Sequence, residues 1–386
     1  MQNRYTCIVL ALLLLAVAPV KADFAFEFGL NNGRSGNMLE DSSVTDAAYT
    51  SLSGSARWYP DQSIEMRWTE EYTRYYNNLD GLSNLRSTLG LSVVPTRSTS
   101  KFRLYISGNF NGRIYKDDFR DFSSTNDFDL IGSASYKLAL NSQIRTGAKA
   151  TYKVYTNAEI DDITTWEAFI GFNQTLPQRT AFDIELGYST GSYQYVNSWD
   201  EEHNRPTGAI TSERSYSILD DGDMKIWYIS PRISKQLGNK LGLSATYSHR
   251  EIIDRNDSAL VYGYSTSLLS PANKTYEGDG ITIRAKSYHI PKSVLEMGFG
   301  YWEKDFLKTI ETTHDVFQGA EIITTLFAKD RSDKRRRIYA EYTRPLSLGG
   351  YFLEPKLRIE SIHNSSTLVV YDYDYFDLSL ALTLKF

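Results

Sequence analysis

The sequence predicts an all-β chain that closes into a transmembrane antiparallel up-and-down β-barrel of sixteen strands, with fourteen or eighteen strands as alternatives. Three observations lead to this prediction. Apolar and polar residues alternate with period two through sixteen segments, as side chains do on the two faces of a strand. Many segments are about 10–13 residues long, which suits the roughly 9–11 residues that a tilted strand needs to cross a bilayer. Short and long connections also alternate along the chain.

The first five segments show the alternation most directly. Phenylalanines share one face of 24–30, and aliphatic residues oppose a row of serines in 47–59. The segments 64–69 and 84–94 oppose apolar residues to charged or hydroxyl residues. In 102–114, six polar residues stand in register opposite Phe and Ile side chains. Such segments fit a sheet with one apolar and one polar face.

Eleven further segments continue the pattern, at about 126–138, 142–155, 164–175, 181–195, 222–235, 241–250, 280–290, 294–304, 335–343, 351–363 and 373–386. Pro231 and Pro355 fall inside two of them, where each removes a hydrogen-bond donor. We therefore expect a bulge or a wrong local span at each proline. The segments 259–269 and 320–327 are also strand-like. They could extend strands, form a small hairpin or fold inward, and they would raise the count to eighteen if they span.

The connections predict the orientation of the barrel. If the first strand starts in the periplasm, the periplasmic turns are short and lie at 60–63, 95–101, 139–141, 176–180, 236–240, 291–293 and 344–350. The extracellular connections include long loops at 31–46, 197–221, 251–279 and 305–334. This asymmetry is typical of outer-membrane barrels. A soluble β-sandwich is the alternative, but its strands usually have about 5–6 residues.

The first 22 residues have the three parts of a secretory signal peptide. Arg4 supplies the positive charge, residues 8–18 form an apolar run, and small residues precede a cleavage position after Ala22. We expect a cleaved signal peptide at 1–22 and one barrel domain at 23–386. Cys7 is the single cysteine, so the mature chain would hold neither disulfides nor thiolate metal sites.

The last strand adds a resemblance to a known group of proteins. One face of this strand is continuously apolar and carries Phe376, Leu378, Leu380, Leu382, Leu384 and Phe386. The segment resembles the C-terminal strand of Gram-negative outer-membrane β-barrels. The resemblance implies an integral outer-membrane protein with both termini in the periplasm. It also implies contact with outer-membrane lipid and lipopolysaccharide, and recognition of this strand by the barrel-assembly machinery.

The polar faces predict a charged, water-filled lumen, because unpaired buried charges cost several kcal/mol and a sixteen-strand barrel is wide. A basic wall is expected from Arg86, Arg103, Arg113, Lys137, Arg145, Lys149 and Lys153. An acidic part is expected from Glu167, Asp183 and Glu185, and later strands add charges that include Arg232, Arg284, Lys286 and Glu296. The charged side chains of these walls either select anionic or sugar-like solutes or simply form ion pairs across neighbouring strands. Four residues on one strand could be satisfied in the second way: Glu354, Lys356, Arg358 and Glu360.

Signals for other chemistry are weak. Ser287 and His289 share a strand face, as a nucleophile and its base would, but no acid is identifiable beside them. The acidic clusters 200–202 and 220–223 lack the spacing of a defined calcium loop. The formal net charge of −5 argues against a nucleic-acid partner. We expect no enzyme activity, no metal and no cofactor.

The sequence thus predicts an outer-membrane channel of porin type for passive diffusion of small hydrophilic, anionic or sugar-like solutes. The alternative is a non-channel barrel, either an export or assembly pore or a surface adhesion scaffold. A barrel enzyme is a third possibility, which depends on the weak Ser/His pair. The sequence does not indicate an oligomeric state.

Overall fold

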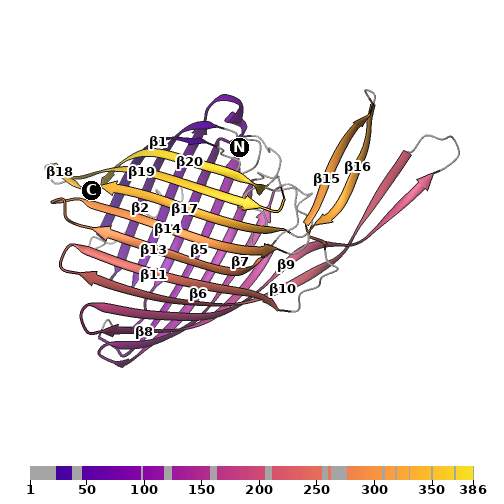
Figure 1. Ribbon diagram of the computed structural model, residues 1–386. Helices are drawn as coiled ribbons and strands as arrows, with labels where there is room; N and C mark the ends of the chain where they lie inside the picture. Colours follow the sequence, from indigo (N-terminus) through magenta and orange to yellow (C-terminus); the bar gives the residue numbers. More distant parts are fainter. Residues whose placement is uncertain are drawn as a thin grey trace.

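The computed structural model describes residues 23–36, 46–96, 99–116, 124–156, 163–204, 211–253, 260–261, 276–306, 309–317, 320–329, 331–348, 351–368 and 371–385. The expected signal peptide and Phe386 lie outside these residues. Within them, no helix has the length and apolarity that a membrane-crossing helix requires. Sixteen long antiparallel strands pair in sequence order around a closed ring, which is the predicted fold (Figure 1).

All sixteen predicted segments lie within or largely overlap strands of the ring, although the ninth and tenth strands run well beyond theirs. The first eight are β1 (Asp23–Gly36), β2 (Ala47–Asp61), β3 (Ile64–Tyr75), β4 (Asn84–Val93), β5 (Phe102–Tyr115), β6 (Thr125–Ala139), β7 (Ser142–Tyr155) and β8 (Ile163–Leu176). The other eight are β9 (Thr180–Asn204), β10 (Thr211–Leu237), β11 (Leu241–Ile253), β13 (Tyr276–Ser287), β14 (Val294–Phe306), β17 (Ser332–Thr343), β19 (Tyr351–Ser366) and β20 (Tyr373–Lys385). The ring closes where β20 pairs with β1, from Glu27 opposite Lys385 to Gly36 opposite Phe376.

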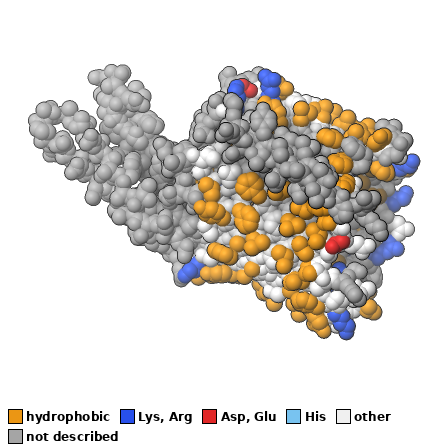
Figure 2. Space-filling view, turned by 180° about the vertical axis from the view of Figure 1, so that it is seen from behind, with side chains coloured by type: hydrophobic (Ala, Val, Ile, Leu, Met, Phe, Trp, Pro, Cys, Tyr) orange, Lys and Arg blue, Asp and Glu red, His pale blue; other side chains and the backbone are white. Residues whose placement is uncertain are grey.

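Burial is inverted relative to a soluble protein. On β20, Leu378 and Leu380 are 42% and 57% exposed, whereas Asp377 and Ser379 are only 7% and 8% exposed. The apolar face therefore points outward and the polar face points into the barrel. Hydrophobic side chains spread over the visible outer surface, and Lys and Arg side chains gather at its edges (Figure 2). This arrangement suits a barrel whose solvent outside is lipid.

All seven short connections lie at one end of the barrel, as expected. Both described ends of the ring lie there too, since Asp23 faces Tyr59 and Lys385 faces Phe352. Adjacent turns are tied together at one point. Arg179 has a positive φ of 56°, and its guanidinium donates to the Gly238 carbonyl at 2.9 Å and to Asn239 Oδ1 at 2.6 Å.

The opposite end carries extensions beyond the ring. β9 and β10 run on as a long two-stranded ribbon, and β15 (Thr309–Phe317) pairs with β16 (Ala320–Lys329) in a hairpin that also projects (Figure 1). The predicted loop at 197–221 is therefore wrong over most of its length, because strand pairing continues past the expected membrane span. The segment 320–327 forms the small hairpin and does not cross, so the count stays at sixteen.

Smaller elements complete the two ends. β12 (Leu260–Val261) pairs with β9 and β15, and β18 (Leu346–Leu348) pairs with β19. The 3₁₀-helix η1 (Asn77–Leu82) forms most of the β3–β4 connection and packs Leu79 and Leu82 against Ala47. A hydrogen bond from the Lys116 ammonium lowers the pKa of the Asp80 carboxyl in this connection.

The two prolines are accommodated without the expected bulges, and each lies inside a strand, as predicted. Pairing between β10 and β11 stops after Ile229 and resumes at Arg232 with the same register, so Pro231 only interrupts the ladder. The Pro355 carbonyl accepts a hydrogen bond from the Arg344 N–H at 3.1 Å. Arg344 lies in the break between β17 and β18. The missing N–H of Pro355 is on this side, where it interrupts no strand pairing.

The outward apolar face yields a test with a matched control. Leu130 is 46% exposed in the middle of β6, and Ser133 lies on the inward face of the same strand. Because Leu130 faces lipid, Leu130→Arg should lower the free energy of unfolding in lipid vesicles by about 2–4 kcal/mol. Ser133→Arg should have a much smaller effect. Equal losses in chemical-denaturant titrations would contradict this assignment of faces.

Candidate functional site

One side of the interior has balanced charges. On β19, the Lys356 ammonium lies 3.2 Å from Glu341, and the Arg358 guanidinium lies 2.6 Å from Glu360. Glu354 lies 3.1 Å from the Lys385 ammonium on β20, and Arg337 on β17 also pairs with Glu360. All four charged residues expected to pair on this strand therefore do so. We call this part, on β17, β19 and β20, the balanced wall.

The seven residues of the predicted basic wall lie on the inward faces of β4 to β7. Arg86 and Arg103 are exposed within the barrel. The Arg113 guanidinium donates to the Tyr115 hydroxyl at 3.2 Å, and the Lys153 ammonium lies 5.0 Å from the centroid of the Tyr155 ring. The remaining residues are Lys137, Arg145 and Lys149. Lys149 lies 3.7 Å from Asp129, so not all of this wall is available to a solute.

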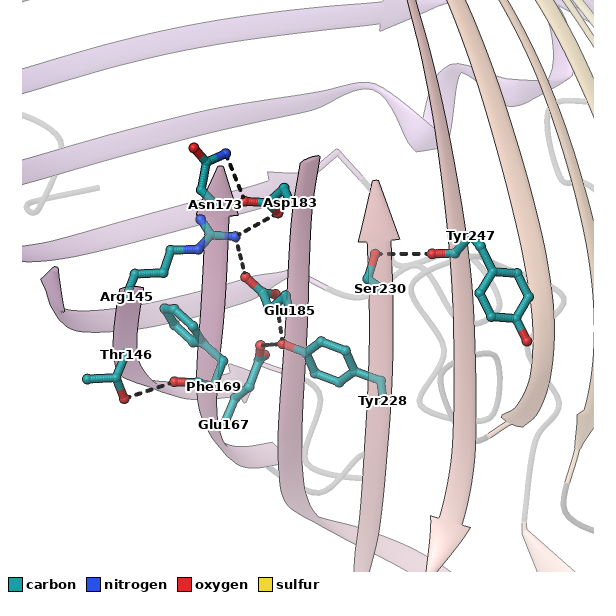
Figure 3. A network of polar contacts seen from close by, with 10 residues as sticks. All are labelled: Arg145, Thr146, Glu167, Phe169, Asn173, Asp183, Glu185, Tyr228, Ser230 and Tyr247. Atoms are coloured by element: carbon teal, nitrogen blue, oxygen red, sulfur yellow. Dashed lines mark hydrogen bonds and ion pairs between the residues drawn. The ribbon is translucent and has the colours of Figure 1, made fainter. Parts of the chain in front are cut away.

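Arg145 joins the predicted acidic residues in one network (Figure 3). Its guanidinium donates to Glu185 at 2.7 Å and to Asp183 at 3.4 Å. The Tyr228 hydroxyl donates to Glu167 at 2.7 Å and lies 3.1 Å from Glu185. The structure therefore brings Glu167, Asp183 and Glu185 together, with one arginine among them. Sequence reasoning missed Tyr228.

A glycine allows Tyr228 to lie against the barrel wall. Gly187 is its direct partner on β9, and a Cβ atom there would lie 2.2 Å from the tyrosine ring. The same combination occurs twice more among the described glycines. Tyr339 covers Gly298 and donates to Glu296 at 2.8 Å, and Tyr49 covers Gly33 and donates to Asp377 at 3.3 Å. An inward glycine paired with an inward tyrosine is a signal that only the strand register reveals.

Two adjoining cavities open beside this network. The smaller has a volume of about 230 Å³, and the larger about 410 Å³. The smaller cavity is lined by Arg145, Asp183, Glu185, Ser230, Arg232, Ser244, Thr246 and Arg284. The larger lies toward the short turns, where its lining includes Arg179, Lys235, Lys286 and Glu296. Arg232, Ser244 and Arg284 line both cavities, so the two form one continuous recess.

Arg232 and Arg284 supply two of the positive charges of this recess, which Arg145, Arg179, Lys235 and Lys286 also line. Both are exposed inside the barrel, and among the described residues neither forms an ion pair with a carboxylate. Arg232 faces Asp183 in the strand register. The Asp183 carboxylate nevertheless accepts from Arg145 and from the Asn173 amide, each at 3.4 Å. These two arginines are not part of the predicted basic wall. Alternation places them on the inward face, but it does not show which inward charges form ion pairs.

The other candidate chemistry is limited. Ser287 Oγ lies 2.9 Å from His289 Nδ1 on an exposed strand end. Within the described residues, no carboxylate lies at hydrogen-bonding distance from His289, so an orienting acid is missing there. The described residues also contain no group of three or more metal-ligating side chains. The acidic side chains of 200–202 and 220–223 lie outside the part that is described.

The glycine beneath Tyr228 gives a stability prediction. Gly187→Ala should push the Tyr228 ring off the wall and break its bonds to the carboxylates, at a cost of about 1–3 kcal/mol. Gly242→Ala is the matched control, because Gly242 also faces inward and a Cβ there meets only the Lys286 carbonyl at 4.0 Å. When both variants are unfolded by denaturant in one membrane mimetic, only Gly187→Ala should show a lower midpoint than the unchanged protein. Equal midpoints would show that the ring tolerates the added methyl group.

Comparison with known proteins agrees with the geometry. No protein-family model and no curated protein matches the sequence. Among solved structures, a BenF-like porin from Pseudomonas fluorescens Pf-5 aligns with TM-score 0.51 and 10% identity, covering 96% of this chain and 100% of that one. OccAB1 from Acinetobacter baumannii aligns with TM-score 0.50 and 11% identity, covering 95% and 97%. The chain therefore shares its fold with outer-membrane porins.

Proposed function

We propose that this protein is an outer-membrane channel of porin type, through which small hydrophilic solutes diffuse passively. The observation that carries the proposal is the closed ring of sixteen strands with charged side chains inside it. Arg86, Arg103, Arg232 and Arg284 point inward yet remain exposed. A barrel whose interior were packed shut would bury such side chains, whereas a barrel of this size accommodates water.

The recess favours solutes that carry a negative group. Arg232 and Arg284 lack carboxylate partners in the described part, and Glu296 is the one acidic residue lining the larger cavity. Because the charged residues that line the larger cavity are mainly basic, it should concentrate solutes of negative charge. The hydroxyl groups of Ser230, Ser244 and Thr246 also suit sugar-like solutes.

Location and partners follow from the same proposal. The barrel would lie in the outer membrane with its short turns and both termini in the periplasm. Lipid and lipopolysaccharide would contact the apolar outer face, and the barrel-assembly machinery would recognise β20. The inverted burial of Leu378 and Asp377 supports a lipid environment for this strand.

A surface scaffold is the second candidate function. The observation in its favour is the ribbon of β9 and β10, which have 25 and 27 residues and extend beyond the ring (Figure 1). A scaffold would need the ribbon and the β15–β16 hairpin but no open lumen. Ion conductance therefore separates the two functions.

Planar-bilayer recording of the refolded protein should show a steady open conductance with anion preference. Replacing Arg232 and Arg284 together by Gln should lower the anion-to-cation permeability ratio by at least about twofold, because the recess loses two positive charges. Replacing Lys356 and Lys385 together by Gln removes the same charge from the balanced wall. This control should change the ratio less.

The possible outcomes are distinct. A protein that inserts into the bilayer but never conducts ions would contradict the channel proposal. An open channel in which both double variants change the ratio equally would show that the recess has no special part in selecting solutes.

A further inference from the structure

We propose that the smaller cavity binds small zwitterions, with the solute carboxylate against Arg232 and Arg284 and its ammonium group against Asp183 and Glu185. The inference rests on the proposed channel, since the solute must reach the cavity through the lumen. It goes beyond simple anion preference, because it assigns the two opposite charges of one solute to two different groups of residues that line one cavity. All four residues line this cavity of about 230 Å³.

The acidic side has more negative than positive charge. One guanidinium, that of Arg145, serves both Glu185 at 2.7 Å and Asp183 at 3.4 Å. The hydrogen bonds to Asp183 from Arg145 and Asn173 are both long, at 3.4 Å. A carboxylate can accept about four hydrogen bonds, so both acids have capacity left for an ammonium group. Glu167, held by Tyr228, adds a further negative charge nearby.

The basic side offers two exposed guanidinium groups. Arg232 stands on β10 and Arg284 on β13, with β11 between them. The guanidinium group presents several N–H donors in a planar fork that matches the two oxygens of a carboxylate. A solute carboxylate near either arginine would supply the partner that the described residues do not provide.

The rest of the lining is short and polar. Ser244 and Thr246 lie on β11, between the strands of Arg232 and Arg284, and Ser230 on β10 faces Glu185 in the strand register. Every residue that lines the smaller cavity is polar or charged. Its volume equals that of roughly eight water molecules at about 30 Å³ each. A solute the size of 4-aminobutyrate therefore fits the cavity, and the lining gives a purely apolar solute no favourable surface.

The competing arrangement is an internal ion pair. Because Arg232 faces Asp183 across the β9–β10 register, the two side chains could pair when no solute is present and close the cavity to ligands. In that case the recess would act only on monoanions, through Arg284 and Lys286. The two arrangements predict different solute preferences.

Three probes of matched length separate them: 4-aminobutyrate, butyrate and n-butylammonium. Each is titrated into the folded protein in detergent micelles by calorimetry, and each is also tested for block of the ion current in bilayers. The zwitterion should bind about fivefold more tightly than either singly charged probe, as expected of one additional solvent-accessible ion pair.

Two variants assign the ends of the solute. Glu185→Gln keeps the side-chain size and an acceptor for Tyr228, and it should remove the advantage of 4-aminobutyrate over butyrate without weakening butyrate. Arg284→Gln should weaken 4-aminobutyrate and butyrate by similar factors. Lys356→Gln, on the balanced wall, should leave the order of the three probes unchanged. Heat-modifiable gel migration confirms that each variant is folded, and Asp183→Asn replaces Glu185→Gln if that variant is not.

The inference is overturned if butyrate binds as tightly as 4-aminobutyrate, if no probe binds, or if Glu185→Gln weakens butyrate equally. The calorimetric result does not depend on conductance. An open channel without zwitterion preference would overturn this inference alone, whereas a folded protein that never conducts would overturn the proposed function.

Discussion

Closure of the sheet is the constraint on which the rest of this structure depends. A strand exposes backbone N–H and C=O groups along both edges, and lipid offers them no hydrogen-bond partner. Pairing β20 with β1, from Glu27–Lys385 to Gly36–Phe376, removes both edges of the ring. Once the ring is closed, the alternation along every strand must sort side chains into an outer and an inner set. The exposed leucines and buried Asp377 of β20 are a direct result of this sorting.

The interior then differs from place to place according to which charges find partners. On the balanced wall, lysines, arginines and glutamates of β17, β19 and β20 satisfy one another, and the network is left with little net charge. Between β7 and β13 the pairing is incomplete. Arg145 draws the carboxylates of Asp183 and Glu185 toward β7, which leaves Arg232 and Arg284 facing the recess. The selectivity that we propose therefore depends on which charged side chains form ion pairs, not on the total charge of the lumen.

The fold could be predicted from the sequence because period-two alternation is local. The alternation within each strand shows which of its faces meets lipid, so the sixteen strands and the seven short turns can be predicted one segment at a time. The candidate site could not be predicted as well, because its geometry depends on register and on side-chain direction. Alternation places Arg145 and Glu185 on the inward face, but it does not say that they touch. It could not reveal Tyr228 over Gly187, nor the continued pairing of β9 and β10 outside the ring.

The tyrosines that lie over glycines have a consequence for the bore of the barrel. A ring that lies over a glycine takes up the space that a side chain at that position would otherwise occupy. With strand number fixed, the cross-section at that height is set by whether a position such as Gly187, Gly298 or Gly33 has a side chain. A barrel of this fold can therefore be widened or narrowed at a chosen depth through single substitutions, without gaining or losing a strand.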